Sequence, residues 1–383
     1  MSFRKKVIAN KPKVALESIT TLIVAGYKGG KTHLYKQLTE LHYENPDHAL
    51  LLAFEDGYET WELDNVLPLH AEGTDENLWK VWEYFKKTIT PDLVKEAKEG
   101  RITKLLGVDT ADRAIDACTA WVIRDRSTKY AKKFTSLQDI SDKTNENGWT
   151  ALYEELKKPF DTLKNAGYGF IHLAWTKEKE TTLYDGKKYN SIQLMMNNTA
   201  KKVFESQASL ICCIQNEVDV LDKNGNVLEE NIKDKKGREL ASNFRETSQV
   251  MYFRPSGFVE CAGGRYENLP EKVPFGGENF LKVFEDAVTG QLKKTDSTVE
   301  ELKTEQEIAR DEKAQTVEVE QELTAEDLFV EINDKVAGMT GQQKTKVAKL
   351  FNDSFGDPNY KLHEGDLTKL KIVAKHVDTV LNA

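Results

Sequence analysis

Cysteine is scarce in this sequence, with four residues among 383, namely Cys118, Cys212, Cys213 and Cys261. Two of them are neighbours in the chain and cannot easily bridge each other, and none stands in a metal-ligand spacing such as C-x-x-C. This usage argues against a disulfide framework and against a cysteine-held metal ion. It is typical of core thiols in a reducing cytosol.

Long apolar runs are also absent. The basic start at residues 1–6 is not followed by an apolar stretch of signal-peptide or membrane-spanning length. We therefore expect a soluble cytoplasmic protein. No internal repeat is detectable, which argues against a solenoid or propeller.

Neither sign of charge dominates, because 54 Lys and Arg stand against 63 Asp and Glu, a net charge of −9. Most of the excess lies in residues 291–330, where 12 acidic and 5 basic residues give a net −7. The rest of the chain is close to neutral. Its composition does not indicate a strongly basic nucleic-acid protein, but it is compatible with a basic groove on one face.

Short apolar runs alternate with longer segments of helical period from residue 20 to about 290. This pattern is typical of an α/β fold, here a core with a mainly parallel sheet flanked by helices. The apolar residues run together rather than alternate, as in buried parallel strands. We predict strands at 20–25, 49–54, 104–109, 168–174, 209–215 and 248–254, and helices at 30–41, 76–89, 111–126, 149–166 and 277–288.

The composition changes after Gly290. Lys, Glu, Thr and Gln dominate residues 291–323, which predicts an acidic linker. From residue 324 onward apolar residues again recur at three- and four-residue steps, interrupted by a turn at residues 356–358. The sequence thus predicts a core domain over 1–290, a linker over 291–323 and a small helical C-terminal domain over 324–383.

The segment Ala25–Thr32 reads AGYKGGKT and stands between the first predicted strand and a helix. In this strand, loop and helix order, backbone N–H groups and the helix N-terminus bind phosphates. We expect Lys31 to reach the β- and γ-phosphates of ATP and the Thr32 hydroxyl to ligate Mg²⁺. Ala25 replaces the usual first glycine, which requires a negative φ there. The predicted nucleotide-binding residues are Gly26, Tyr27, Lys28, Gly29, Gly30, Lys31, Thr32 and His33; the alternative is a glycine-rich turn that binds nothing.

Acidic residues follow two other predicted strands. Asp109 ends LLGVD, where a P-loop protein needs a carboxylate for the Mg²⁺ shell, although an Asp there could instead cap the next helix. Asp112 is a weaker alternative ligand. Glu55 follows the second strand at the edge where open α/β sheets bind ligands, and it is our candidate for activating water. Asp56 and Glu59 compete with Glu55 for that role.

The strand that ends HLAWTKEKE supplies the remaining candidate. Thr176 is predicted to sense the γ-phosphate from a neighbouring strand end. His172 lies inside the apolar run and is more typical of a core histidine than of a catalytic one.

With these motifs the chain resembles the phage-encoded RecA-like P-loop ATPases related to the Sak-type single-strand annealing proteins. The resemblance covers roughly residues 15–290 and rests on AGYKGGKT, LLLAFEDGYE, LLGVDTAD, HLAWTKEKE and the late segment 253–270. It implies that Glu55 activates water and that Asp109 holds the metal shell. It further implies ATP-modulated binding of single-stranded DNA during phage recombination or replication, in the cytoplasm of the host.

In RecA-like cores the loops that touch DNA follow the strands of the metal-shell acid and of the sensor. The resemblance places them at 124–147 and 177–202. Both segments interleave cations with aromatic residues, which suits a phosphate track with base stacking, although acidic residues dilute the charge of the second. An ordinary solvated Lys-rich loop is the alternative. The residues are Arg124, Arg126, Lys129, Lys132, Lys133 and Phe134, and then Lys177, Lys179, Tyr184, Lys187, Lys188, Tyr189, Lys201 and Lys202.

Two hypotheses of different classes follow. The first is a DNA-stimulated ATPase that assembles as a ring or filament, with Arg245, Arg254 or Arg265 reaching the γ-phosphate in a neighbouring copy. The second is an ATP-gated adaptor with little hydrolysis, which recognises a single-strand-binding, replication or recombination protein through its C-terminal region. Stimulation of hydrolysis by single-stranded DNA distinguishes them.

Overall fold

The computed structural model describes residues 10–182, 186, 188–221, 243–292, 297–318, 325–359 and 367–381. The chain divides into two compact units, Met1–Val319 and Glu320–Ala383.

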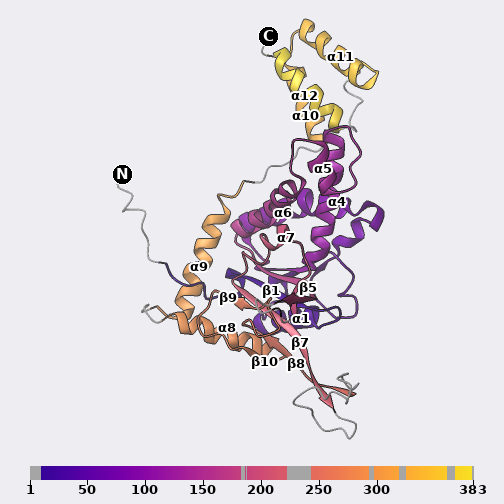
Figure 1. Cartoon of the computed structure of the whole chain (residues 1–383). Coiled ribbons are helices and arrows are strands. Elements are labelled where there is room, and N and C mark those ends of the chain that lie inside the picture. The colour runs from indigo at the N-terminus through magenta and orange to yellow at the C-terminus, as the bar shows by residue number, and fades with distance from the viewer. Residues whose placement is uncertain are drawn as a thin grey trace, which may run out of the picture. The chain divides into compact units, whose positions relative to one another are not determined.

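The first unit is built on a mostly parallel sheet with helices on both faces (Figure 1). Its strand order is β10-β8-β7-β1-β5-β4-β2-β3, with β6 paired to β5 and β9 to β7. Neighbours from β7 through β3 are parallel, and β8 and β10 extend the sheet in antiparallel fashion. The predicted α/β class is confirmed. The strands are β1 (Thr20–Ala25), β2 (Ala49–Ala53), β3 (Val66–Leu67), β4 (Leu105–Asp109), β5 (Gly169–Thr182), β6 (Lys188–Leu194), β7 (Leu210–Leu221), β8 (Asn243–Tyr252), β9 (Gly263–Gly264) and β10 (Lys272–Pro274).

Strand β1 shows why the core strands read as continuous apolar runs. Leu22 and Val24 belong to the core on one face of the sheet, whereas Ile23 and Ala25 belong to the core on the other. All of them are fully buried. A strand covered on both faces needs apolar side chains at every position.

Helices cover the two faces. The core on the face of Leu22 and Val24, here called the first core, contains residues of α2, α3, α4 and α6. The core on the other face, the second core, contains residues of α1 and α8. A π-helical segment, Phe85–Ile89, joins α2 to α3. The helices of this unit are α1 (Lys31–His42), α2 (Trp79–Tyr84), α3 (Thr90–Gly100), α4 (Ala111–Lys129), α5 (Leu137–Lys143), α6 (Gly148–Asn165), α7 (Asn198–Lys201), α8 (Gly277–Gln291) and α9 (Val299–Ala314).

Strand β5 is longer than the predicted 168–174. Beyond Ala174 its side chains become partly or fully exposed, and the strand pairs antiparallel with β6 from Thr176 to Thr182. A polar, solvent-facing strand carries no continuous apolar run, so no pattern in the sequence indicates it. The segment 177–202, predicted as a loop, is therefore largely a β-hairpin followed by α7.

Helix α9 occupies part of the predicted linker 291–323. It begins at a capping box formed by Thr298 and Glu301, and its Leu302 is fully buried in the second core. Most of its other contacts are polar, including an ion pair of Glu307 with Lys104 at 2.7 Å. Because Leu302 and Ala314 are, among the described residues of this helix, the only fully buried ones and the rest is largely polar, its composition resembles that of a linker. The first compact unit accordingly extends to Val319 instead of ending at residue 290.

The second unit is helical, as predicted for the C-terminal region. It consists of α10 (Ala325–Ala337), α11 (Gly341–Phe355) and α12 (Leu367–Leu381). Its core is separate from the two cores of the first unit and includes Leu328, Phe329, Ile332, Val336, Met339, Val347, Phe351, Leu370, Val373 and Val377.

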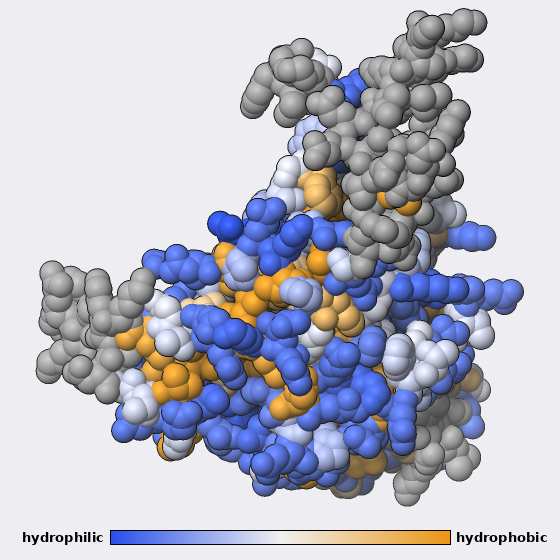
Figure 2. Space-filling model, turned by 90° about the horizontal axis from the view of Figure 1, so that it is seen from below, coloured by the Kyte–Doolittle hydropathy of each residue, from blue (hydrophilic) through white to orange (hydrophobic). Residues whose placement is uncertain are grey.

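Hydrophilic side chains cover much of the face in Figure 2, and apolar side chains gather in patches between them. Within the described part of the chain, every helix is too short or too polar to cross a membrane. All four cysteines are free and buried, as predicted from their usage.

Candidate functional site

The loop between β1 and α1 has the backbone that its glycines require. Gly30, the residue before α1, has φ of 85°, in the left-handed region. A Cβ atom on Gly29 would lie 2.7 Å from the Cβ of Ala25 and 3.0 Å from the carbonyl oxygen of Gly26. Ala25 is the last residue of β1, where alanine is unstrained. The loop therefore accepts alanine at its first position while Gly29 and Gly30 cannot be replaced without strain.

Lys31 and Thr32 open helix α1. The Lys31 side chain is buried, and its Nζ donates a hydrogen bond to the Gly26 carbonyl oxygen at 3.2 Å, across the loop. Burial lowers the pKa of Lys31, and the charges of Asp109 and Glu55 oppose that shift. The ammonium thus lies inside the loop, where phosphate oxygens would replace the carbonyl as its partners.

Thr32 reaches the acid predicted for the metal shell. Its Oγ1 donates to Oδ2 of Asp109 at 2.8 Å. Asp109 is almost fully buried, and burial raises the pKa of its carboxyl. A hydroxyl and a carboxylate side by side are oxygen ligands of the kind that Mg²⁺ takes, and that ion completes its shell with phosphate oxygens and water. The residues present therefore fit a Mg²⁺ ion.

Glu55 lies beside this pair because β2 and β4 are parallel neighbours, with Ala53 in register with Asp109. Its backbone N–H donates to the Asp109 carbonyl oxygen at 3.1 Å, and its Oε2 accepts from the Thr110 hydroxyl at 3.2 Å. Burial and the nearby Asp109 charge raise the pKa of Glu55 to about 7. A carboxylate with a pKa near neutrality is suited to accept a proton from water.

The structure distinguishes between the alternative roles that were predicted for these acidic residues. Thr110, not Asp109, caps α4, since its hydroxyl accepts from the Arg113 backbone N–H. Asp112 is buried and accepts from the Trp175 backbone N–H at 2.7 Å, so it fastens the middle of β5 to α4. Burial raises the pKa of Asp112 to about 6. The competing Asp56 and Glu59 are exposed.

Strand β5 brings the predicted sensor to the same edge of the sheet. Trp175 is in register with Ala25, and Thr176, the next residue, pairs with Leu194 of β6. Thr176 is half-buried. It therefore lies just past the start of the phosphate loop, between the strands that carry the loop and Asp109.

His172 is a core residue, as its position in the apolar run indicated. It is buried and lies against the rings of Phe160, Phe170 and Phe204 at centroid distances of 4.9–5.4 Å. Burial lowers the pKa of His172 to about 3, so the imidazole is neutral at physiological pH.

Several contacts around the loop escaped prediction, including the ring contacts of Tyr27 and His33, which are themselves among the predicted nucleotide-binding residues. Gln249 of β8 donates its side-chain N–H to the Gly29 carbonyl oxygen at 3.3 Å. The exposed Tyr27 lies 4.8 Å from the Trp175 ring, and His33 stacks on Trp61 at 4.5 Å. These contacts join segments far apart in the chain, and no motif marks them. A cavity of about 550 Å³ adjoins Glu55 and is lined in part by Arg113 and Trp175.

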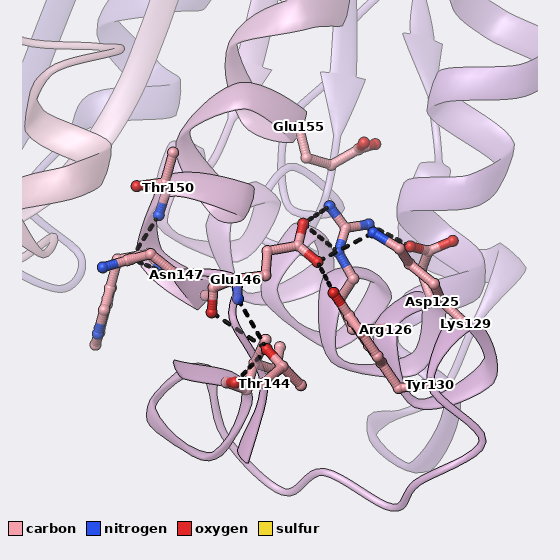
Figure 3. A network of polar contacts seen from close by, with 12 residues as sticks. Asp125, Arg126, Lys129, Tyr130, Thr144, Glu146, Asn147, Thr150 and Glu155 are labelled. Carbon is pink, nitrogen blue, oxygen red and sulfur yellow. Dashed lines mark hydrogen bonds and ion pairs between the residues drawn. The ribbon is translucent and has the colours of Figure 1, made fainter. Parts of the chain in front are cut away.

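The first predicted DNA loop, 124–147, is mostly helical, because α4 continues to Lys129 and α5 begins at Leu137. Two of its cations, Arg126 and Lys129, pair with Glu146 (Figure 3). Glu146 accepts from Arg126 at 2.9 Å, from Lys129 at 3.2 Å and from the Tyr130 hydroxyl at 3.1 Å. Phe134 is buried and cannot stack on a base. Phe134 thus does not serve as a base-stacking residue in this structure, and DNA binding by the cations of this segment stays a prediction.

In the second segment, 177–202, some lysines are exposed to solvent and others are paired within the fold. Lys177, Lys179 and Lys202 are exposed, whereas Lys188 pairs with Glu180 at 2.6 Å. The Tyr189 hydroxyl donates to Glu260 at 3.2 Å. Tyr184 and Lys187 lie outside the described residues.

The three arginines proposed to act on a neighbouring copy are placed as follows. Arg254 is exposed. Arg265 follows β9, which pairs with the start of β7, so it lies at the sheet edge opposite the phosphate loop, and it donates to the Ser206 carbonyl oxygen at 2.6 Å. The side chain of Arg245 lies outside the described part of the structure.

Comparison with known protein families gives one match over most of this unit. A family model described as an AAA domain matches residues 17–256, which contain the phosphate loop, Glu55, Asp109 and Thr176. A search of curated proteins found no match.

Proposed function

Because the chain belongs to the AAA domain family of nucleotide-binding ATPases, we propose that it binds Mg-ATP at residues 26–33 and hydrolyses it with Glu55 as the water-activating carboxylate. The observation that carries this proposal is the cluster at the end of the glycine loop. There the Thr32 hydroxyl bonds to Asp109, and Glu55 follows the adjacent strand with a raised pKa.

The chain's own groups account for each part of the reaction. Backbone N–H groups at the start of α1 would bind the phosphates, and Lys31 would exchange the Gly26 carbonyl for β- and γ-phosphate oxygens. Thr32 and Asp109 would hold Mg²⁺, which when bound neutralises phosphate charge. Glu55 would take the proton of a water whose oxygen attacks the γ-phosphorus, while the bond from that phosphorus to the β–γ bridging oxygen breaks.

Two further groups would position these residues. The Thr110 hydroxyl, bonded to Oε2 of Glu55, would orient the carboxylate toward the water. Thr176 would lie near the γ-phosphate because its strand runs between the loop strand and the Asp109 strand. Its hydroxyl would then differ in contacts between the ATP and ADP states.

The ATPase is further proposed to act on single-stranded DNA in recombination, by annealing or strand exchange, or in replication. Support comes from the resemblance to the phage RecA-like ATPases and from the β5–β6 hairpin. The exposed Lys177 and Lys179 follow Trp175 and Thr176 directly, on the strand that pairs with β1. DNA on the hairpin could thereby alter the position of Thr176 relative to the phosphate loop. We propose a ring or filament of identical copies as the active form.

Steady-state ATP hydrolysis with and without single-stranded DNA, at a stated low salt concentration, tests this function. We expect DNA to raise the rate of the wild type, and Lys31→Ala to be inactive under both conditions. Lys36→Ala serves as the matched control, because Lys36 lies on the same helix in a surface ion pair with Glu40. ATP binding with hydrolysis that is absent or indifferent to DNA would instead favour the ATP-gated adaptor.

The hairpin has its own test. In Lys177→Ala/Lys179→Ala we expect the basal ATPase rate to be retained and the stimulation by DNA to fall by at least about tenfold, since exposed cations bind phosphates additively. Lys282→Ala on α8, also an exposed lysine, provides the control. Unchanged stimulation in the double variant would remove the hairpin from the DNA site.

A further inference from the structure

A second cavity lies at the opposite edge of the sheet from the phosphate loop. It has a volume of about 270 Å³ and is lined by residues 18–20, where the chain enters β1, by residues 164, 167 and 168 around the end of α6, and by α9. Because β1 carries the phosphate loop at its other end, this cavity is separate from the nucleotide site. Nothing in the proposed ATPase reaction uses it.

Cations dominate the lining of this cavity. Lys13, Lys164, Arg310 and Lys313 face one carboxylate, Glu17. That carboxylate is already engaged, because its Oε2 lies 3.1 Å from His42 Nε2 and accepts from the Tyr43 hydroxyl at 3.3 Å.

Within the described structure Lys13 and Lys313 have no acidic partner, whereas the charge of Asp161 attracts Lys164. Lys313 donates to the amide oxygen of Asn165 at 2.7 Å and Lys164 to that of Gln207 at 3.4 Å, so both have uncharged partners. Partial burial, together with repulsion from the other three cations of the cavity, lowers the pKa of Lys13. An anion in the cavity would relieve this repulsion.

Two buried polar atoms in the same place have no partner within the described structure. The Oγ of Ser18 and the Nε of Arg310 are shielded from solvent and make no hydrogen bond. The Ser18 residue is only 8 % exposed. Buried donors are nearly always paired in folded proteins, so these two atoms are polar groups that the described part of the protein leaves unsatisfied beside the cavity.

The walls of the cavity are held in place without a ligand. Gln306 of α9 donates to the Pro12 carbonyl oxygen at 2.7 Å and accepts from the Val14 N–H at 3.2 Å, which fastens the chain before β1 to the helix. Arg310 donates through a second nitrogen to the Glu17 carbonyl oxygen at 2.9 Å. Such preorganisation reduces the ordering cost of binding.

We propose that this cavity binds a terminal phosphate group. A phosphate monoester carries close to two negative charges and several acceptor oxygens, which match a guanidinium, lysine ammonium groups and a hydroxyl. The volume suits a free nucleotide or pyrophosphate, or the phosphorylated end of a single strand, rather than a length of duplex. The shared chemistry of these sources is the terminal phosphate.

Calorimetric titration of the full chain carrying Lys31→Ala, in which the phosphate loop lacks its lysine, tests the proposal with pyrophosphate as the probe. We expect binding to this parent, and a loss of at least about tenfold in affinity when Lys13→Gln and Lys313→Gln are added. Lys282→Gln, an exposed lysine of α8, should leave the affinity unchanged. No binding to the parent, or equal affinity after the two substitutions, would overturn the proposal.

One additional variant and one pair of oligonucleotides complete the test. Lys164→Gln, added alone to the parent, removes a third cation from the lining and should also weaken binding, which guards against a folding defect in the double variant. A 5′-phosphorylated oligonucleotide that binds more tightly than its 5′-hydroxyl counterpart would identify a strand end as the ligand, and equal binding of the two would identify a free phosphate compound. The parent lacks Lys31, so these results are independent of whether the ATPase proposal holds.

Discussion

At the scale of single residues, the phosphate loop depends on the absence of a side chain at Gly29. A Cβ there would approach the Ala25 Cβ to 2.7 Å, closer than such atoms come in proteins. We predict that Gly29→Ala weakens ATP binding by at least about tenfold, because the loop must open to admit the methyl group. Equilibrium titration with a fluorescent ATP analogue measures this.

Gly290→Ala is the matched control for that substitution. No atom lies within 4 Å of the Cβ position at Gly290, which is in helix α8, so the new methyl group meets open space. Its affinity for ATP should equal that of the wild type. Equal binding by Gly29→Ala and Gly290→Ala would show that the loop has more room than the structure indicates.

The sequence predicted the local parts of this site and missed the distant ones. The phosphate loop, Glu55 and Asp109 were predictable because each stands at a strand end, where position along the chain determines position in space. The bonds from Thr110 to Glu55 and from Gln249 to Gly29 were not. They depend on packing between segments far apart in the chain, for which the sequence carries no periodic signal.

At the scale of elements, Glu17 joins the entry to β1 to helices α1 and α9. Burial alone would raise the pKa of Glu17, but hydrogen bonding from His42 and the charges of His42 and Arg310 lower it to about 2. A carboxyl with a lowered pKa stabilises the fold above its ordinary pKa of about 4.5, and that stabilisation is lost as the pH falls from there toward about 2.

We therefore predict that Glu17→Gln lowers the free energy of unfolding by about 2 kcal/mol at pH 7, and that the difference shrinks as the pH approaches 3. Urea denaturation across this pH range measures it. Glu40→Gln, a surface residue of α1, should differ little from the wild type at either pH. A difference for Glu17→Gln that does not depend on pH would contradict a role for its charge.

The same elements show where sequence patterns stop being informative. The six predicted core strands are present because burial on both faces demands continuous apolar residues. The hairpin partner β6 and helix α9 were missed since few of their residues are buried and polar contacts add to their attachment, as in the ion pair of Lys104 with Glu307. Composition cannot distinguish such a helix from a solvated linker.

At the scale of the whole molecule, the boundary between the two compact units after Val319 predicts that the second unit can be removed without destabilising the first. A chain ending at Val319 keeps both cores of the first unit and all of α9. We expect its free energy of unfolding and its basal ATPase rate to match those of the first unit in the full chain. Thermal denaturation and hydrolysis assays measure the two quantities.

A chain ending at Leu292 is the contrasting case. It loses the buried Leu302 and the bond from Arg310 to the Glu17 carbonyl oxygen, so the remaining unit should be less stable by at least about 3 kcal/mol. Equal stability of the two truncated chains would show that α9 does not belong to the first unit.

The most direct test of the account compares Glu55→Gln with Glu59→Gln in ATP hydrolysis, with ATP affinity measured on the same samples. Glu59 is an exposed carboxylate four residues further along the chain and serves as the control. We predict that Glu55→Gln keeps its affinity for ATP and loses at least about 100-fold in hydrolysis, while Glu59→Gln retains both. Hydrolysis by Glu55→Gln at the wild-type rate would contradict the assignment of Glu55 and the proposed mechanism with it.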